Sequence, residues 1–265
     1  MNTRMTLTYF NRLKNVHKHI KKGKRLLNIA CGFGDYNYYL RDFFEESYGV
    51  DISISEISLA SRLNQKNTNI HFLKGDIRKI PFKKNFFDTV ICIETLEHVR
   101  ETQKALSELA RVLAENGQVI ITLPVKEFPF TYDPINAVLQ MLRKKTIPIG
   151  AYGFGHKKLY SIKKIRALIT KHFDIIEEKY LSHSLIGLIE NYVPSIFARF
   201  IKMNYKNKGN NRESVVEIRD YTDYNFPNFL KAIYNLIIFI DETLFAWDGR
   251  CISYMVIAKK KRAST

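Results

Sequence analysis

The sequence has few cysteines and no paired arrangement of them. Cys31, Cys92 and Cys251 are far apart and form no CxxC pair. This spacing excludes a disulfide framework and a cysteine-based zinc site. Such cysteine usage is typical of a reducing compartment, and we therefore expect a cytoplasmic location.

The sequence also lacks a long uninterrupted apolar run. Its first 22 residues, MNTRMTLTYFNRLKNVHKHIKK, are basic and contain no apolar core of a secretory signal. The most apolar later stretch, Phe229 to Trp247, contains Lys231, Asp241 and Glu242. It therefore falls short of a typical membrane-spanning helix.

Acidic residues are scarce relative to basic ones. The 265 residues include 42 Lys and Arg against 26 Asp and Glu, for a net charge of +16 at pH 7. This charge attracts nucleic acids, anionic membranes and small anions, and charge alone selects none of them. The basic residues are spread over 12–25, 143–164 and 259–262, and no RNA-binding module is recognisable. A nucleic-acid substrate is therefore a minor alternative.

Short apolar runs alternate with segments of helical periodicity from about residue 25 onwards. This alternation predicts an α/β fold with a doubly wound, mostly parallel sheet of seven strands. The expected strands are residues 26–30, 48–51, 70–73, 89–93, 119–123, 173–180 and 252–258. The expected helices between them are residues 36–44, 55–63, 102–113 and 162–171.

Three segments fall outside this alternation and extend the sheet domain. Residues 1–24 predict a basic amphipathic helix, residues 126–160 a helical cap over the substrate, and residues 182–250 an amphipathic insertion before the last strand. The cofactor-binding core is expected to comprise residues 25–125. It continues in residues 161–181 and ends with the last strand and basic tail, residues 251–265.

A glycine-bearing turn follows the first expected strand. Gly32 and Gly34 allow a tight turn and a close approach of a ligand to the backbone. The helix that begins just beyond them attracts negative charge. An ordinary strand-to-helix turn explains this short motif about equally well.

Acidic residues follow three further strands of the expected sheet. Asp51 stands where nucleotide-binding folds place a carboxylate that accepts both ribose hydroxyls. As an alternative, Asp51 caps the next helix, although Ser53 or Ser55 could do so instead. Asp76 and Glu94 follow the third and fourth strands. Because parallel strands end at one edge of the sheet, we expect these residues to line one crevice.

At these residues the sequence resembles the class I S-adenosylmethionine-dependent methyltransferases, in particular the small-molecule enzymes of ubiquinone and menaquinone biosynthesis. The resemblance covers residues 25–125 and continues more loosely through 155–161 and the last two strands. The positions that it marks as cofactor-binding are Asn28, Ala30, Gly32, Gly34, Asp51, Ile52, Asp76, Ile77, Ile93 and Glu94.

The resemblance implies a Rossmann-like class I fold, S-adenosylmethionine as cofactor, and methyl transfer to a small or lipid-like acceptor. A tRNA- or rRNA-modifying methyltransferase and a non-catalytic cofactor-binding adaptor are the alternatives. The motif for methylating nucleic-acid bases is missing after the fourth strand, where residues 94–97 read ETLE. A nicotinamide dinucleotide is disfavoured because Tyr36 occupies the region where a third glycine is needed.

Two residues depart from the family's DxGxGxG motif. Asn28 stands where the family has aspartate, and Ala30 stands where it has the first glycine. These changes remove one charge from the loop and add one methyl group. Because a methyl group is small, we expect cofactor binding to survive.

His98 and His156 are the candidate general bases. A neutral histidine suits the removal of a proton from a phenol or alcohol acceptor, although either side chain could instead hold a loop through a hydrogen bond. Glu94, Glu97 and His98 also suggest a divalent-cation site, which the resemblance supports. We prefer the interpretation that Glu97 helps to begin a helix, and we expect no metal.

The insertion contains two amphipathic segments, residues 184–200 and 228–247. Such helices could lie on an anionic membrane and present a lipid-linked substrate, with Ile237, Phe239, Leu244 or Phe245 among the headgroups. As an alternative, they form a lid or a dimer contact. The oligomeric state is left open.

Overall fold

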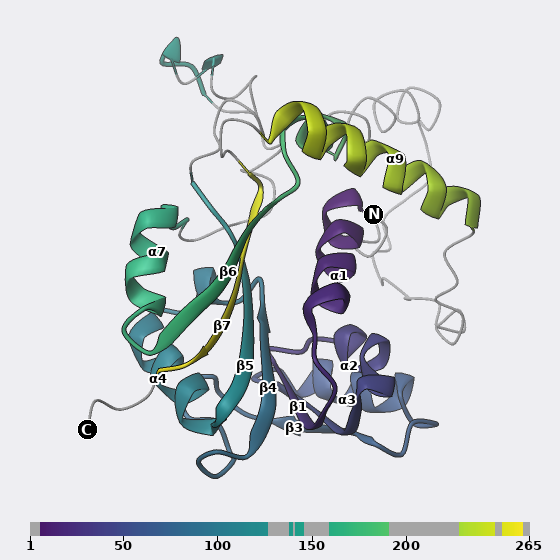
Figure 1. Cartoon of the computed structure of the whole chain (residues 1–265), viewed down its shortest axis with the longest axis vertical. Coiled ribbons are helices and arrows are strands. Elements are labelled where there is room, and N and C mark those ends of the chain that lie inside the picture. The colour runs from purple at the N-terminus through teal and green to yellow at the C-terminus, as the bar shows by residue number, and fades with distance from the viewer. Residues whose placement is uncertain are drawn as a thin grey trace, which may run out of the picture.

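A computed structural model describes residues 6–126, 138–139, 141–145, 159–190, 228–246 and 251–261. These residues form one seven-stranded sheet with the strand order β3-β2-β1-β4-β5-β7-β6 (Figure 1). The strands are β1 Gly23–Ile29, β2 Phe44–Asp51, β3 Ile70–Lys74, β4 Phe87–Ile93, β5 Leu113–Pro124, β6 Phe173–Leu181 and β7 Ser253–Lys260. The helices are α1 Leu7–His19, α2 Asp35–Tyr39, α3 Ile54–Leu63, α4 Thr102–Val112, α7 Ile162–Ile169 and α9 Asn228–Phe245, with 3₁₀ turns η2 Arg41–Phe43 and η3 Leu96–His98.

The sheet is parallel except at its last two strands. Strands β3, β2, β1, β4 and β5 pair in parallel, whereas β7 runs antiparallel between β5 and β6. The strand order reverses between β1 and β4, and open α/β sheets bind ligands at such a point. The predicted doubly wound, mostly parallel fold is confirmed.

Helices cover both faces of the sheet (Figure 1), with α4 and α7 on one side and α1, α2 and α3 on the other. Val90 and Cys92 of β4 pack in the cluster that includes α4 and α7, whereas Ile91 packs in the cluster with α1 and α2. Successive side chains of a strand point to opposite faces, so a strand buried on both faces is apolar at every position. This explains the continuous apolar runs of the central strands.

Three predicted helices are too long, and the one expected over residues 162–171 ends at Ile169. The other two run into strands of the sheet. The helix expected over residues 36–44 ends at Tyr39 and is followed by η2, because Phe44 already pairs with Gly23 as the first residue of β2. The helix expected to reach residue 113 ends at Val112, because Leu113 pairs with Phe87. In both cases strand pairing across the sheet overrides the local helical periodicity.

Helix α1 packs against α9 and the start of the insertion. Thr8 donates hydrogen bonds to Glu190 from its backbone amide at 2.7 Å and from its hydroxyl at 2.6 Å. The buried carboxylate of Asp241 in α9 accepts from the backbone amides of Leu185 and Ile186 at the start of helical residues 184–190. Carboxylates thus satisfy the unpaired amide groups at the starts of two helices.

None of the described helices is long and apolar enough to cross a membrane. Most of the predicted cap, residues 126–160, lies outside the described residues, as do residues 191–227 of the insertion. The three cysteines are buried, and none of them forms a disulfide within the described residues.

Candidate functional site

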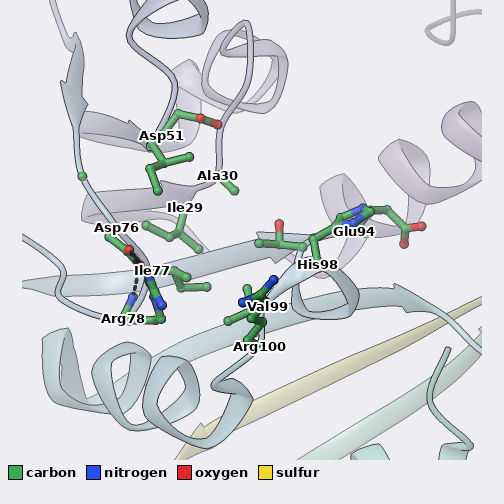
Figure 2. A pocket seen from close by; sticks show the side chains of 13 residues that line it. Ile29, Ala30, Asp51, Asp76, Ile77, Arg78, Glu94, His98, Val99 and Arg100 are labelled. Carbon is green, nitrogen blue, oxygen red and sulfur yellow. Dashed lines mark hydrogen bonds and ion pairs between the residues drawn. The ribbon is translucent and has the colours of Figure 1, made fainter. Parts of the chain in front are cut away.

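A cavity of about 510 Å³ lies at the C-terminal ends of the parallel strands, beside the point where the strand order reverses. Figure 2 shows that Asp51, Asp76 and Glu94 approach it from different sides. The predicted site residues that line the cavity are Ala30, Asp51, Ile52, Asp76, Ile77, Glu94 and His98. Asn28, Gly32, Gly34 and Ile93 do not line this cavity, and His156 lies outside the described residues.

The turn after β1 has the left-handed backbone that the glycine pattern predicts. Its positive φ angles are +55° at Ala30, +51° at Gly32 and +79° at Gly34. A Cβ at Gly34 would also clash with the ring of Phe72. Ala30 therefore adopts a conformation that costs an L-residue about 1–2 kcal/mol, at the position where the family's motif has glycine.

Asp51 joins the end of β2 to this turn. Its Oδ2 accepts a hydrogen bond from the Gly32 amide at 3.0 Å, and its Oδ1 accepts from the Ser53 amide at 2.9 Å. Ser53 itself caps α3, because its hydroxyl accepts from the Glu56 amide. A carboxylate has about four lone-pair sites, so Asp51 retains acceptor capacity beside the cavity.

Asn28 lies beneath the turn, away from the cavity. The residue is 2% exposed, and its side chain donates to Asn37 Oδ1 at 2.7 Å. Asn37 in turn donates to the Ser47 hydroxyl at 2.9 Å. This buried chain of amides connects β1, α2 and β2. The amide of Asn28 thus supplies a donor that an ionised aspartate lacks.

Asp76 is held in place by Arg78. The Arg78 side chain donates to both Asp76 oxygens, with Nη2 at 2.6 Å from Oδ2 and Nε at 3.0 Å from Oδ1. Arg78 Nη1 also reaches Glu101 at 3.0 Å. The hydrogen bonds from Arg78 lower the pKa of Asp76, so this carboxyl stays ionised at the cavity wall.

Glu94 is the most constrained residue of the site. Its backbone has φ of +46°, and its Oε1 accepts from the hydroxyls of Thr122 at 3.0 Å and Ser253 at 3.1 Å. The same oxygen lies 3.3 Å from Nη1 of Arg12, which extends from α1. Two strands and the N-terminal helix therefore fix one carboxylate at the cavity.

Arg12 does not line the cavity itself, but it holds the lining residue Glu94, a contact that the sequence did not reveal. Its side chain is 12% exposed, and its Nε donates to the Tyr36 hydroxyl at 3.3 Å. Burial lowers the pKa of Arg12, whereas the negative charge of Glu94 and the hydrogen bond to Tyr36 together raise it by more. The net shift is upward, so the guanidinium stays charged. No local sequence signal marks Arg12, because its partners Tyr36 and Glu94 are far from it along the chain.

Glu97 is buried in η3 and does not begin a helix as we expected. Neither of its side-chain oxygens has a hydrogen-bond partner among the described residues, and its Oε1 lies 3.7 Å from His98 Nε2. Burial, with the nearby charge of Glu94, raises the pKa of Glu97 to about 8. The interpretation of Glu97 as a capping residue is wrong, because η3 turns its side chain into the interior, where it is 0% exposed.

The imidazole of His98 lines the cavity and is half exposed. Among the residues that the structure describes, no three His, Cys, Asp or Glu side chains are arranged to hold a metal ion. The alternative of a cation site at Glu94, Glu97 and His98 therefore finds no support there.

The sheet order and the cavity at its reversal point define the class I methyltransferase fold. Residues 27–121 match a family described as a methyltransferase domain. This match over part of the chain agrees with the resemblance found in the sequence.

Curated methyltransferases match part of this chain. The demethylmenaquinone methyltransferase of Bacillus licheniformis is 31% identical over 105 residues, which are 38% of this chain and 45% of the relative. A ubiquinone biosynthesis O-methyltransferase of Coxiella burnetii is 30% identical over 140 residues, 51% of this chain and 60% of the relative. The chain thus matches about half the length of these curated relatives.

One similar solved structure carries a ligand. It is phosphoethanolamine N-methyltransferase 2 of Haemonchus contortus, bound to phosphomonomethylethanolamine and S-adenosylhomocysteine. Its TM-score is 0.56 at 17% sequence identity, and the match covers 96% of this chain and 53% of that one. At this identity the likeness establishes the fold alone.

Proposed function

We propose that the protein is an S-adenosylmethionine-dependent methyltransferase that acts on a small or lipid-like acceptor. The observation that carries this proposal is the position of Asp51. This residue is 9% exposed, lies at the C-terminal end of β2 and lines the cavity beside the turn after β1. In nucleotide-binding folds of this type, a carboxylate at this position accepts both ribose hydroxyls.

The other cavity residues fit the same cofactor. The cavity volume of about 510 Å³ lies within the roughly 300–1,000 Å³ of small-molecule sites. Ile52 and Ile77 offer apolar surfaces to an adenine ring. Asp76 is fixed by Arg78 and offers a carboxylate to an exocyclic amine. Ribose and adenine therefore both find suitable groups.

The cofactor supplies an activated methyl group together with its leaving group. The protein's own residues then need only to bind and orient both reactants and to exclude water. A general base is useful where the acceptor loses a proton. His98 is our candidate for that role, because its imidazole lines the cavity and lies 3.7 Å from the buried carboxyl of Glu97. His156 remains a second candidate.

We propose a quinone-like acceptor, on the strength of the relatives' names. Two relatives are named for demethylmenaquinone and ubiquinone biosynthesis. No observation favours the RNA-modifying or the adaptor alternative over this assignment. We further propose that residues 126–160 and 182–250 provide the acceptor side of the site, around the cofactor-binding core of residues 25–125.

We also propose that the protein contacts a membrane surface through α9. This helix exposes a stripe of large apolar side chains at helical spacing, consisting of Phe229, Ile233, Leu236, Phe239 and Leu244. Ile237 instead packs inward against the cluster that includes Ile186 and Ile238. An apolar helical face on a chain of net charge +16 suits reversible binding to anionic lipid.

Transfer of a radiolabelled methyl group from S-adenosylmethionine to a naphthoquinol or benzoquinol acceptor tests the proposed activity. We expect label in the quinol fraction and none in bulk tRNA. Label in tRNA alone would overturn the acceptor class. Cofactor binding without transfer to quinol, lipid or RNA acceptors would favour the adaptor alternative.

A further inference from the structure

A second cavity lies between α4 and α7, which pack on the same face of the sheet (Figure 1). Its volume is about 420 Å³, and its lining includes Arg100, Lys104, Tyr160 and Lys164. Arg100 also lines the cavity of the functional site (Figure 2), so the two cavities are neighbours that share one side chain. None of the residues proposed to bind the cofactor lines the second cavity.

The uncharged polar side chains of the second cavity are already paired within the protein. The hydroxyls of Thr102 and Tyr160 form a hydrogen bond of 2.6 Å. Gln103 donates from its Nε2 to the Leu168 carbonyl at 3.2 Å, and its Oε1 lies 3.2 Å from Nε2 of His172. These contacts connect α4 to α7 and its flanking residues. The walls of the cavity are therefore held in place, and their neutral groups are engaged before any ligand binds.

The charged side chains of the second cavity are paired unevenly. Its carboxylate, Glu101, accepts a hydrogen bond from Arg78 Nη1 at 3.0 Å and lies 4.0 Å from Lys104 Nζ. The guanidinium of Arg100 and the ammonium of Lys164 have no hydrogen-bond or ion-pair partner among the described residues. The lining thus leaves two cations open, while its carboxylate is already engaged from outside the cavity by Arg78.

A compact anion with several acceptor oxygens matches these open groups. Guanidinium and ammonium groups both bind phosphate oxygens through charge-assisted hydrogen bonds. A phosphate monoester carries about two negative charges and three acceptor oxygens, so it can pair with Arg100 and Lys164 together. We infer that the second cavity binds a phosphate group, carried either by a small molecule or by a lipid headgroup. Phosphate binding here does not depend on the proposed methyl transfer.

The setting of Arg100 and Lys164 distinguishes them from other exposed cations of this basic chain. Lys163 stands next to Lys164 on α7 and is exposed as well, but it does not line the cavity. Net charge alone would make the two lysines equivalent toward an anion. A defined site in the cavity makes Lys164 matter and Lys163 not, so the pair provides a matched comparison.

Calorimetric titration with inorganic phosphate and with glycerol 3-phosphate, at constant ionic strength, tests a free phosphate as the ligand. We expect saturable binding to the wild type. Arg100→Gln and Lys164→Gln should each weaken it roughly three- to tenfold, because each removes one charged contact from a partly exposed site. Lys163→Gln removes the same charge from the same helix and should leave the affinity within about 1.5-fold.

Co-sedimentation with phosphatidylcholine vesicles that contain phosphatidic acid tests a lipid headgroup as the ligand. Because α9 is also proposed to contact anionic vesicles, the informative quantity is the difference between Lys164→Gln and Lys163→Gln. Weaker vesicle binding by Lys164→Gln alone, without binding of free phosphate, assigns the site to a headgroup. Equal behaviour of Lys163→Gln and Lys164→Gln in both experiments, including absence of binding in both, would overturn the inference.

Discussion

The buried carboxyl of Glu97 lies 3.7 Å from Nε2 of His98, at the wall of the cavity. The two residues are adjacent in the chain, yet η3 turns one side chain into the interior and leaves the other half exposed. Because burial raises the pKa of Glu97 to about 8, this carboxyl is mainly protonated at neutral pH. A neutral acid thus lies beside the candidate base.

The raised pKa of Glu97 makes the stability of the protein depend on pH. The pKa of Glu97 is near 4.5 in the unfolded state and about 8 in the folded state. At pH values between these two, the folded state therefore binds more protons than the unfolded state. Stability is therefore lost as the pH rises through this window, by about 1.4 kcal/mol per pH unit. Glu97→Gln stays neutral, so its free energy of unfolding should exceed that of the wild type increasingly from pH 5 to pH 8.

Urea denaturation at several pH values measures this difference. Glu45→Gln, an exposed carboxyl on β2, serves as the control and should give a curve parallel to that of the wild type. Parallel curves for Glu97→Gln and the wild type would show that Glu97 ionises normally in the folded protein.

His98→Gln should separate catalysis from cofactor binding. If His98 removes a proton from the acceptor, its loss should lower kcat about 10²–10⁴-fold with little change in cofactor affinity. His17→Gln, at an exposed position of α1, provides the control. Steady-state kinetics and calorimetry on the same preparations measure both quantities. A His98→Gln variant with near-wild-type turnover would mean that positioning alone accelerates the transfer.

The exposed stripe of α9 predicts binding to anionic vesicles. Each Lys or Arg near such a surface contributes about 1 kcal/mol, and buried apolar side chains add a contribution that salt does not screen. Liposome co-sedimentation should show binding with partial release at high salt, and loss of binding in the double variant Leu236→Ser with Phe239→Ser.

A matched control for this experiment is Ile176→Ser, which removes the apolar side chain of a residue that is 55% exposed on β6. It should bind vesicles as the wild type does. Absence of vesicle binding by the wild type at low salt would remove the membrane proposal and leave α9 as a lid or an oligomer contact.

The sequence predicted those cavity-lining residues that directly follow the end of a strand. Asp51, Asp76 and Glu94 each follow a recognisable strand, and parallel pairing then brings them to one edge of the sheet. Periodicity and turn chemistry are local properties, so the strand segments and the glycine turn were within reach of the sequence alone.

Long-range contacts were beyond the reach of the sequence. Arg12 meets Glu94 only because α1 packs over the sheet, and nothing near either residue signals the other. The burial of Glu97 was missed for a related reason, since a charged residue in an exposed-looking turn gives no sign of its solvent exposure. Asn28 was placed in the cofactor site by its motif position, yet its amide pairs with Asn37 beneath the turn.

The carboxylate of Asp51 provides the most direct test of the central claim, that this cavity binds S-adenosylmethionine. Asp51→Asn keeps the shape of the side chain and one acceptor for the turn, but it loses charge-assisted hydrogen bonds worth about 1.5–3 kcal/mol each. Asp42→Asn, whose side chain is 80% exposed, is the control. In calorimetric titrations we expect the wild type and Asp42→Asn to bind S-adenosylmethionine alike and Asp51→Asn to bind at least tenfold more weakly. Equal affinity in Asp51→Asn, or tighter binding of NAD than of S-adenosylmethionine by the wild type, would contradict the assignment.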